Sequence, residues 1–344
     1  MENDDARKKR REFLKSLAGL TAGMMLPITG RPLEAAISSM ENPNRVMKDR
    51  MGELLPQRKF GNTGKSITML GLGGAHIARM SDAEAEKTIE RAIEGGVRFF
   101  DNAESYGSGE GERKYGRFLT PKYRDIAFIQ TKTTSRDAKT AKAHLEGTLS
   151  RMKTDYLDLY YIHAVTSPSD VDNRIKNGVL DVLLEAKESG KVKHIGFSGH
   201  SDYKAHIRML ESTDTMEACQ MPINAYDPNY KSFINNVLPI LVEKGIAPIA
   251  MKTLANGGFF GGTSHFNHGS NPRIVPAVLS VQEAVHFSWS MPISTLVTGA
   301  DDAKMLDEKI GLAKTFKAMD ESQRQQLVEK VANFDGKLVE FYKV

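Results

Sequence analysis

The feature that most constrains this chain is an alternation of short apolar runs with longer amphipathic segments, repeated eight times between residues 69 and 313. The runs are apolar almost throughout, rather than at every second position. Strands of this composition are buried on both faces, as in parallel sheets. We expect strands at residues 69–74, 97–100, 126–129, 156–162, 192–197, 219–223, 246–251 and 294–297.

The intervening segments keep the 3.6-residue period of amphipathic helices. The first begins at Ser81, which has the spacing of a capping box with Glu84. The other helices are expected at residues 109–119, 138–152, 175–189, 202–212, 231–244, 276–290 and 302–313. Eight such units predict an α/β protein with a (β/α)8 barrel. A doubly wound sheet is the weaker alternative, because the glycines at residues 71, 73 and 74 lack the spacing of its fingerprint.

Three further segments surround the repeating units. Turn residues at Asn62–Gly64 predict an N-terminal β-hairpin, and residues 320–341 have the pattern of an amphipathic C-terminal helix packed on the barrel. Residues 37–57 are polar and show no periodicity, which is typical of a linker. We therefore predict a signal segment at residues 1–36, a linker at 37–57 and a barrel domain at 58–344.

The charge and cysteine content exclude several classes of function. Lys plus Arg number 47 and Asp plus Glu number 43, and residues 1–36 hold seven of the bases and five of the acids. The remainder is therefore nearly neutral and lacks the excess of basic residues typical of nucleic-acid binding. A single cysteine, Cys219, excludes an intrachain disulfide, a cysteine-rich zinc site and an iron–sulfur cluster held by several cysteines. We expect no metal site.

The N-terminus has the order of an export signal. A basic stretch, residues 7–11, precedes a mildly apolar stretch at residues 17–28. The motif Arg10-Arg11-Glu12-Phe13-Leu14-Lys15 resembles the twin-arginine export signal, which implies the twin-arginine machinery as a partner and a periplasmic location. The signal is either cleaved, with Ala35-Ala36 as the candidate site, or kept as a membrane tether. The alternative is a cytoplasmic protein with a basic tail.

Four proton-handling residues follow three successive strands. Asp101 ends the second strand and Tyr106 lies in the loop after it, while Lys132 ends the third strand and His163 the fourth. Each alone has an ordinary structural explanation, such as a loop cap or a solvent-facing side chain. Because neighbouring strands lie about 4.8 Å apart, however, the barrel would bring all four to one mouth.

This combination suits acid–base chemistry at a carbonyl or alcohol oxygen. A lysine ammonium beside a phenol favours the phenolate, so we expect the pKa of Tyr106 to fall below its usual value of about 10. Asp101 would keep Lys132 charged, and His163 would donate a hydrogen bond to the same oxygen. A hydride source is still needed, so a redox cofactor must complete the reaction.

The sequence from Arg58 to about Leu312 resembles the aldo-keto reductases. The stretch Asp101-Asn102-Ala103-Glu104-Ser105-Tyr106-Gly107 is similar to their Asp-Thr-Ala-x-x-Tyr-Gly motif, and residues 155–163 are similar to their fourth strand. The resemblance implies a catalytic tetrad of Asp101, Tyr106, Lys132 and His163. It also implies a nicotinamide cofactor in the barrel mouth.

The resemblance implies cofactor contacts as well, with departures. Gly199 follows Ser198 where the family has an asparagine that grips the nicotinamide amide, and Met251 stands where many members have an aromatic residue. The family favours NADP, whereas Asp301 and Asp302 near the expected 2′-phosphate position make NAD an alternative. The full set of expected contacts is Ser198, Gly199, Gln220, Met251, Lys252, Gly299, Ala300, Lys304 and Glu308.

We predict an oxidoreductase that moves hydride to or from a carbonyl or alcohol carbon. Export would favour a tightly held cofactor, and then a coupled or redox-neutral reaction such as epimerisation or elimination. A non-catalytic binding or regulatory barrel is the alternative. Aromatic and histidine residues at 259, 260, 265, 266 and 268 suggest a sugar-like substrate. The sequence gives no expectation for the oligomeric state.

Overall fold

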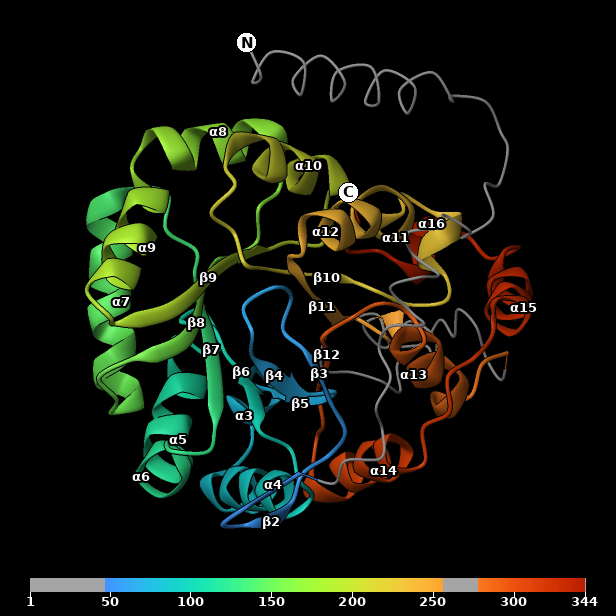
Figure 1. Cartoon of the computed structure of the whole chain (residues 1–344), viewed down its shortest axis with the longest axis horizontal. Coiled ribbons are helices and arrows are strands. Elements are labelled where there is room, and N and C mark those ends of the chain that lie inside the picture. The colour runs from blue at the N-terminus through green and yellow to red at the C-terminus, as the bar shows by residue number, and fades with distance from the viewer. Residues whose placement is uncertain (1–46, 256–277, 344) are drawn as a thin grey trace.

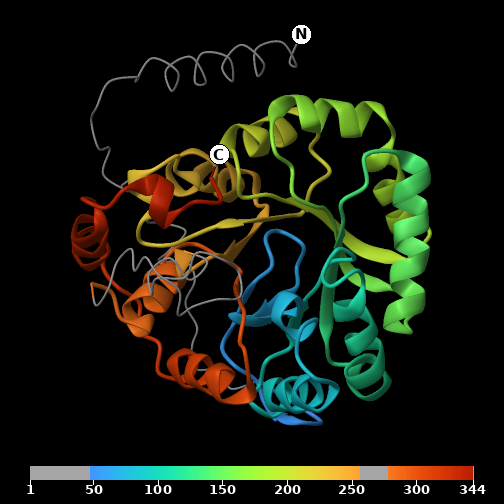
Figure 2. The same cartoon turned by 180° about the vertical axis from the view of Figure 1, so that it is seen from behind.

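The computed structural model describes residues 47–255 and 278–343, which form a closed barrel of eight parallel strands surrounded by helices (Figure 1, Figure 2). The strands follow the chain around the barrel in the order β5 to β12, and β12 pairs with β5 to close it. Their bounds are β5 Leu70–Gly73, β6 Phe99–Asp101, β7 Phe128–Thr133, β8 Leu157–Ile162, β9 Val192–Ser198, β10 Ala218–Pro222, β11 Ala247–Met251 and β12 Thr295–Thr298. The predicted (β/α)8 barrel is confirmed.

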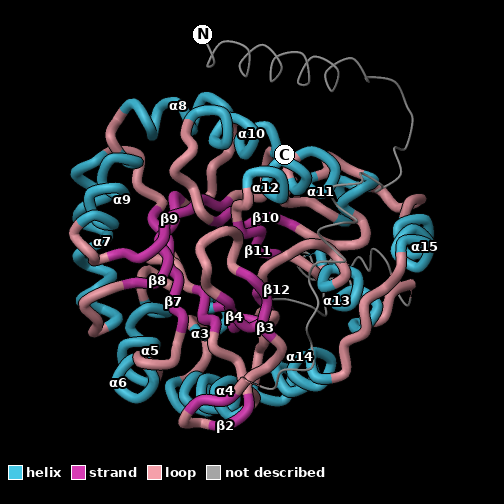
Figure 3. Tube along the Cα trace, in the orientation of Figure 1, coloured by secondary structure: helices cyan, strands magenta, loops and turns pink. Residues whose placement is uncertain are grey.

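The helices lie outside the strands in a ring (Figure 3). Those that follow the successive barrel strands are α3 Gly74–Ile77, α4 Asp82–Glu94, α5 Glu110–Phe118, α6 Thr120–Tyr123, α7 Ala138–Met152, α8 Pro168–Lys176, α9 Val179–Glu188, α10 Tyr203–Ser212, η1 Asp227–Asn229, α11 Phe233–Asn236, α12 Leu238–Lys244, α13 Val281–Trp289 and α14 Ala303–Lys314. In the part of the chain that the structure describes, none of them is long and apolar enough to cross a membrane.

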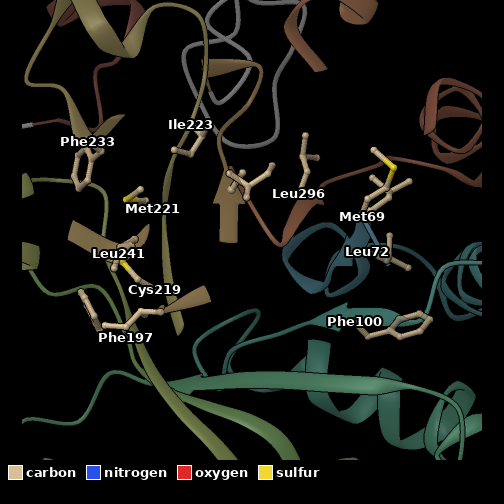
Figure 4. Packing of buried hydrophobic residues seen from close by; sticks show 14 of the residues in the cluster. Met69, Leu72, Phe100, Phe197, Cys219, Met221, Ile223, Phe233, Leu241 and Leu296 are labelled. Atoms are coloured by element: carbon tan, nitrogen blue, oxygen red, sulfur yellow. The ribbon is translucent and has the colours of Figure 1, made fainter. Parts of the chain in front are cut away.

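Apolar side chains fill both sides of the strand layer. Outside the barrel, residues such as Phe100, Phe197 and Leu296 pack between strands and helices (Figure 4). A smaller cluster fills the interior and comprises Phe60, Ile67, Phe99, Leu159, Tyr161, Ala218, Ala247 and Ile249. Burial of a Leu, Ile or Phe side chain contributes about 1.5–3 kcal/mol. The two-sided burial explains why the strand sequences are apolar at nearly every position.

Three predicted helices are interrupted. The helix expected at 175–189 is replaced by α8 and α9, which meet at Gly178, where φ is 78°. The helix expected at 231–244 divides into α11 and α12, with a proline in the first turn of α12. The C-terminal helix expected at 320–341 divides into α15 Glu321–Val331 and α16 Gly336–Val339. Glycine in the left-handed region and proline at a helix start are common helix boundaries.

The predicted hairpin closes one end of the barrel. Strands β3 Gln57–Lys59 and β4 Ser66–Thr68 pair antiparallel and lie in the middle of the ring of helices (Figure 1). Phe60 is fully buried in the interior cluster, and the Arg58 guanidinium donates to the carbonyl oxygens of Trp289 (2.6 Å) and Ile293 (3.2 Å). The hairpin plugs the end at which the strands begin, so a ligand can enter only from the other end.

Part of the stretch expected to be a linker is ordered against the barrel. Strands β1 Lys48–Asp49 and β2 Gly52–Glu53 form a small antiparallel pair. The Asp49 carboxylate accepts two hydrogen bonds, of 2.5 and 2.9 Å, from the buried guanidinium of Arg98. A bidentate pair of this kind fixes position as well as charge. The predicted signal segment lies outside the described residues.

Glu340, Tyr342 and Lys343 are buried beside the loop that follows β10. The Lys343 ammonium lies 2.6 Å from the Asp227 carboxylate and also contacts the Glu340 carboxylate. All three side chains are fully buried. Asn224 donates a 2.8 Å hydrogen bond to Glu340. This buried ion cluster attaches the C-terminal segment to the face of the barrel on which the strands end.

Candidate active site

The four predicted catalytic residues come from three neighbouring strands. Asp101 is the last residue of β6, Lys132 lies near the end of β7, and His163 directly follows β8. These strands pair β6 to β7 and β7 to β8. Tyr106 returns toward them from the loop after β6. All four side chains therefore lie at the end of the barrel opposite the hairpin.

Lys132 is the centre of this group. Its ammonium contacts the Asp101 carboxylate, donates to the Asn102 carbonyl oxygen at 2.6 Å and lies 3.4 Å from the Tyr106 hydroxyl. Only 1% of the residue is exposed. Burial alone would lower the pKa of Lys132, but the charge of Asp101 and the phenol of Tyr106 outweigh it and raise that pKa. Lys132 is therefore an ammonium at neutral pH.

The pKa of the Tyr106 phenol is shifted in the direction opposite to the one expected from the sequence. Burial raises the pKa of Tyr106 above its ordinary value of 10, and the opposing effect of Lys132 is too small to reverse the shift. The predicted lowering of this pKa was wrong, because desolvation disfavours a phenolate more than one ammonium at 3.4 Å stabilises it. Tyr106 is thus protonated at neutral pH.

His163 completes the group as a neutral ring. Its Nδ1 lies 2.8 Å from the Ser198 hydroxyl, and its ring meets that of Tyr106 edge-on with centroids 6.0 Å apart. Burial, followed by the charge of Lys132, places the pKa of His163 well below its ordinary value of 6.5. A neutral imidazole can offer one N–H to a ligand oxygen without competing for the proton of Tyr106.

A pocket of about 640 Å³ opens above these residues. Asp101, Tyr106 and His163 line it together with Gln220 of β10 and Met251 of β11. Of the other expected cofactor contacts, Lys252, Gly299 and Glu308 also line the pocket, whereas Ser198, Gly199, Ala300 and Lys304 are not among its lining residues.

One departure from the family pattern has a steric cause. A Cβ atom at Gly199 would lie 2.6 Å from the Val165 carbonyl oxygen and 2.7 Å from the His206 ring. Contacts below 3.0 Å force a neighbour to move. An asparagine therefore does not fit at position 199 without displacement of the backbone at Val165. Position 199 therefore offers no side-chain amide to a ligand.

The C-terminal segment contacts two residues that line the pocket. The Tyr342 carbonyl oxygen lies 3.3 Å from His200 Nδ1, and the Lys252 ammonium lies 4.8 Å from the centroid of the Tyr342 ring. His200 and Lys252 both line the pocket. Burial lowers the pKa of Lys252 to about 7. These contacts depend on the buried ion cluster that attaches residues 340–343 to the barrel.

The start of α14 carries carboxylates at the far side of the pocket. Asp302 caps the helix by accepting from the Met305 amide at 2.7 Å. Glu84 accepts from the Ala303 amide at 3.0 Å, so it does not complete the capping box predicted with Ser81. Asp301 lies 3.7 Å from the His76 ring. Two amides in the first turn of α14 are therefore already bonded to carboxylates of the chain.

The sequence analysis missed Gln130. This residue lies two positions before Lys132 on β7, is fully buried and contacts both Asp101 and Gln220. Its signal was its position two residues before Lys132, which puts both side chains on the same side because side chains alternate along a strand. The predicted aromatic and histidine loop at residues 259–268 lies outside the described residues.

The residues present fit a nicotinamide dinucleotide. Gln220 offers an amide at the pocket floor, and the buried Thr253 hydroxyl at the pocket wall has no hydrogen-bond partner within the described parts of the chain. Gly299 presents bare backbone to the pocket at the end of β12, where a Cβ atom would overlap the His76 ring. No cluster of three potential metal ligands occurs in residues 47–255 and 278–343.

A sequence model of the aldo/keto reductase family matches residues 69–298, about two thirds of the chain. The chain belongs to the aldo/keto reductase family. This aldo/keto reductase is 30% identical over 222 residues to the uncharacterized oxidoreductase YcsN of Bacillus subtilis (strain 168), covering 59% of the chain and 70% of that relative. It is 27% identical over 232 residues to the L-glyceraldehyde 3-phosphate reductase of Escherichia coli (strain K12), covering 61% and 64%.

A solved structure shows the same fold. The aldo-keto reductase AKR11C1 from Bacillus halodurans, in its holo form, aligns with a TM-score of 0.66 at 18% identity, covering 81% of this chain and 97% of that one. Family membership and the oxidoreductase relatives make the protein an NAD(P)-dependent oxidoreductase of carbonyl or alcohol compounds. They do not favour the non-catalytic regulatory barrel considered above.

Proposed function

We propose that Tyr106 is the general acid/base of a carbonyl–alcohol oxidoreduction, with Lys132 and Asp101 setting its environment and His163 orienting the reacting oxygen. The observation that carries this proposal is the placement of one ammonium within reach of the Asp101 carboxylate, the Asn102 carbonyl oxygen and the Tyr106 hydroxyl. When bound, the nicotinamide supplies or accepts the hydride. The protein's own residues handle the proton.

The charge states favour Tyr106 as a proton donor during reduction. Its hydroxyl is protonated at neutral pH because burial raises the pKa of Tyr106. Lys132 is positively charged and 3.4 Å away, so it stabilises the negative charge that develops on the phenol as the proton leaves. His163, neutral because burial lowers its pKa, donates a hydrogen bond to the same substrate oxygen.

Replacement of Tyr106 by phenylalanine tests this assignment. We expect Tyr106→Phe to lower kcat by at least 10²-fold, a typical contribution of general acid catalysis, while the Kd for NADH measured by fluorescence titration changes by less than about twofold. Tyr203→Phe, on the outer helix α10, is the matched control and should keep full activity. A Tyr106→Phe variant with wild-type turnover would disprove the role of Tyr106.

We further propose that the cofactor is NAD. From the resemblance to the family we expect the adenosine end near residues 298–308, where Glu84 and Asp302 carboxylates cap α14 and the Asp301 side chain is about half exposed. A 2′-phosphate near these carboxylates would be repelled, and this repulsion opposes the attraction of Lys304. Paired titrations with NADH and NADPH test the choice. Tighter binding of NADPH would overturn it.

The export signal suggests where the enzyme works and how it uses its cofactor. We propose twin-arginine export to the periplasm, because residues 10–15 have the order of that signal. This route carries folded proteins, so the cofactor would travel bound and be regenerated in place by a coupled or redox-neutral reaction. Fractionation of the native protein and mass spectrometry of the purified material test both points. A cytoplasmic protein without bound nicotinamide would contradict them.

For the substrate we propose a sugar or a sugar-derived ketone. The support is the aromatic and histidine content of residues 259–268, together with the relative named L-glyceraldehyde 3-phosphate reductase. A panel of aldoses, ketoses and simple aliphatic or aromatic carbonyls, assayed for kcat/KM, tests this class. Higher kcat/KM values for the aliphatic or aromatic carbonyls would exclude it.

A further inference from the structure

Gln130 spans the barrel interior beneath the pocket. Its amide nitrogen contacts the Asp101 Oδ1 and donates to the Gln220 Oε1 at 3.2 Å. Gln220 comes from β10, whose neighbours are β9 and β11, so the Gln130 side chain links strands that do not pair with each other. The Gln220 amide nitrogen in turn lies 3.4 Å from the same Asp101 oxygen. The three side chains form a closed triangle of contacts.

This triangle joins the two functional halves of the pocket floor. Asp101 holds Lys132, which reaches Tyr106. Gln220 lines the pocket where the proposed nicotinamide amide would bind. Gln130 does not line the pocket and cannot touch a ligand directly. Its influence on a ligand can pass only through Asp101 and Gln220.

The interior at this level gives no packing reason for an amide. The cluster that fills the barrel consists of apolar side chains such as Leu159 and Ile249. The Gln130 Oε1 is buried and has no partner among the described residues. An unsatisfied buried acceptor costs about 1–3 kcal/mol, which a leucine or methionine of similar volume would avoid. Packing alone therefore does not explain the amide, which is retained together with its two hydrogen bonds to Asp101 and Gln220.

The hydrogen bonds also fix the orientation of the Gln220 amide. Both N–H groups of Gln130 are used, one on Asp101 and one on Gln220. Gln220 therefore turns its oxygen toward Gln130 and its nitrogen toward Asp101. One lone pair and one N–H of Gln220 remain, which together complement the donor and acceptor of a carboxamide.

We propose that Gln130 is a positioning residue, which orients the Gln220 amide for the nicotinamide carboxamide and couples that contact to Asp101. This inference rests on the proposed function. The removal of Gln130 would leave the Gln220 amide free to rotate, and would take one hydrogen-bond donor away from Asp101.

A double-mutant cycle on cofactor binding tests the inference. The Kd for NADH is measured by fluorescence titration for the wild type, Gln130→Met, Gln220→Leu and the double variant. We expect Gln130→Met to weaken binding about 3–10-fold, the effect of one net hydrogen bond. In the Gln220→Leu background the same change should have almost no effect, because the group that Gln130 orients is gone.

A second measurement separates positioning from a general loss of structure. Gln130→Met removes a hydrogen-bond donor from the Asp101 carboxylate, whose negative charge raises the pKa of Tyr106. We therefore expect the pKa of Tyr106 to rise further, and the basic limb of the pH profile of kcat/KM to move to higher pH. The matched control is Thr295→Val, which removes another buried polar atom from β12 that lacks a partner within the described residues. This control should change neither the Kd nor the pH profile.

The outcomes distinguish this inference from the proposed function. A wild type that binds neither NADH nor NADPH would contradict the proposed function. A wild type that binds and turns over, while Gln130→Met has an unchanged Kd or an equal loss in the Gln220→Leu background, would overturn only the role of Gln130. If Gln130→Met does not fold, Gln130→Leu enters the same cycle, with the thermal midpoint measured with and without NADH.

Discussion

The Lys132 ammonium determines the charge of the whole site. It is buried, and it contacts one carboxylate, one carbonyl oxygen and one phenol. Its charge helps to keep His163 neutral, and its pairing with Asp101 offsets the cost of taking an ammonium out of water. The site therefore holds one acid, Tyr106, whose conjugate base has a positive charge beside it.

A substitution at Gly199 tests whether packing excludes the asparagine that the family has at this position. We predict that Gly199→Asn, which restores the family residue, lowers the free energy of unfolding by about 1–3 kcal/mol, because its Cβ overlaps the Val165 carbonyl oxygen. It should not tighten NADH binding. Urea unfolding and NADH titration check this prediction. Gly311→Asn is the control, since nothing lies within 4 Å of a Cβ at that exposed position; tighter NADH binding by Gly199→Asn would contradict the steric explanation.

The placement of the four candidate residues at one end of the barrel could be predicted from the sequence, whereas their environment could not. Asp101, Lys132 and His163 follow recognisable strands, so the barrel geometry alone brings them together. The sign of the Tyr106 pKa shift depends on how much protein surrounds the hydroxyl, which no local pattern reports. The contacts of Gln130 and the close approach at Gly199 involve residues that are distant in sequence.

The strand–helix units follow the sequence closely because their signals are local. The helix predicted at 138–152 has those bounds in the structure, with Asp137 as its cap. Two of the three interrupted helices had visible signals, a glycine at 178 and a proline at 239, but the apolar periodicity continues across both. Local conformation there outweighs the pattern of burial.

His206, on helix α10, should make the free energy of unfolding depend on pH. This residue is fully buried between the rings of Phe197 and Phe233, and burial lowers its pKa from 6.5 to about 4. Between about pH 6.5 and pH 4 the unfolded chain binds the proton and the folded chain does not, so stability falls as the pH decreases through this range. We expect His206 to contribute about 2 kcal/mol to the loss between pH 7.5 and pH 5.

Urea unfolding at both pH values, for the wild type and His206→Leu, measures this contribution. Each protein is compared with itself at the two pH values, so the effect of the substitution on packing cancels. The decrease in the free energy of unfolding on acidification should be about 2 kcal/mol smaller in His206→Leu than in the wild type. An identical loss in both proteins would show that His206 does not remain neutral in the folded state.

The C-terminal segment should depend on its buried charges. We predict that Lys343→Met lowers the free energy of unfolding by about 3–5 kcal/mol, because it leaves Asp227 and Glu340 buried without a cation. Lys330→Met is the control, since Lys330 pairs with Glu283 at the surface and its loss should cost less than about 1 kcal/mol. Equal effects of the two changes in chemical unfolding would exclude a structural role for the cluster.

On the scale of the whole molecule, the residues that close the barrel and the residues that line the pocket lie at opposite ends. The hairpin closes one end, and the pocket opens at the other. We predict that Phe60→Ala lowers the free energy of unfolding by about 3–5 kcal/mol, because Phe60 fills the closed end. The kcat of the folded fraction should not change.

Chemical unfolding and active-site-normalised kinetics check this separation. Lys65→Ala, on the exposed part of the same hairpin, is the control and should change stability by less than about 0.5 kcal/mol. A fall in kcat with Phe60→Ala in proportion to the loss of stability would mean that the two ends of the barrel are coupled.

The buried ion cluster also sets an order of events during synthesis. Residues 340–343 leave the ribosome after all eight barrel strands, so the nascent barrel first holds Asp227 without the ammonium of Lys343. Until those residues emerge and dock, the contacts of Tyr342 with His200 and Lys252 are missing. The barrel strands would therefore be made before the segment that packs over their ends, and the buried ion cluster would form late in folding.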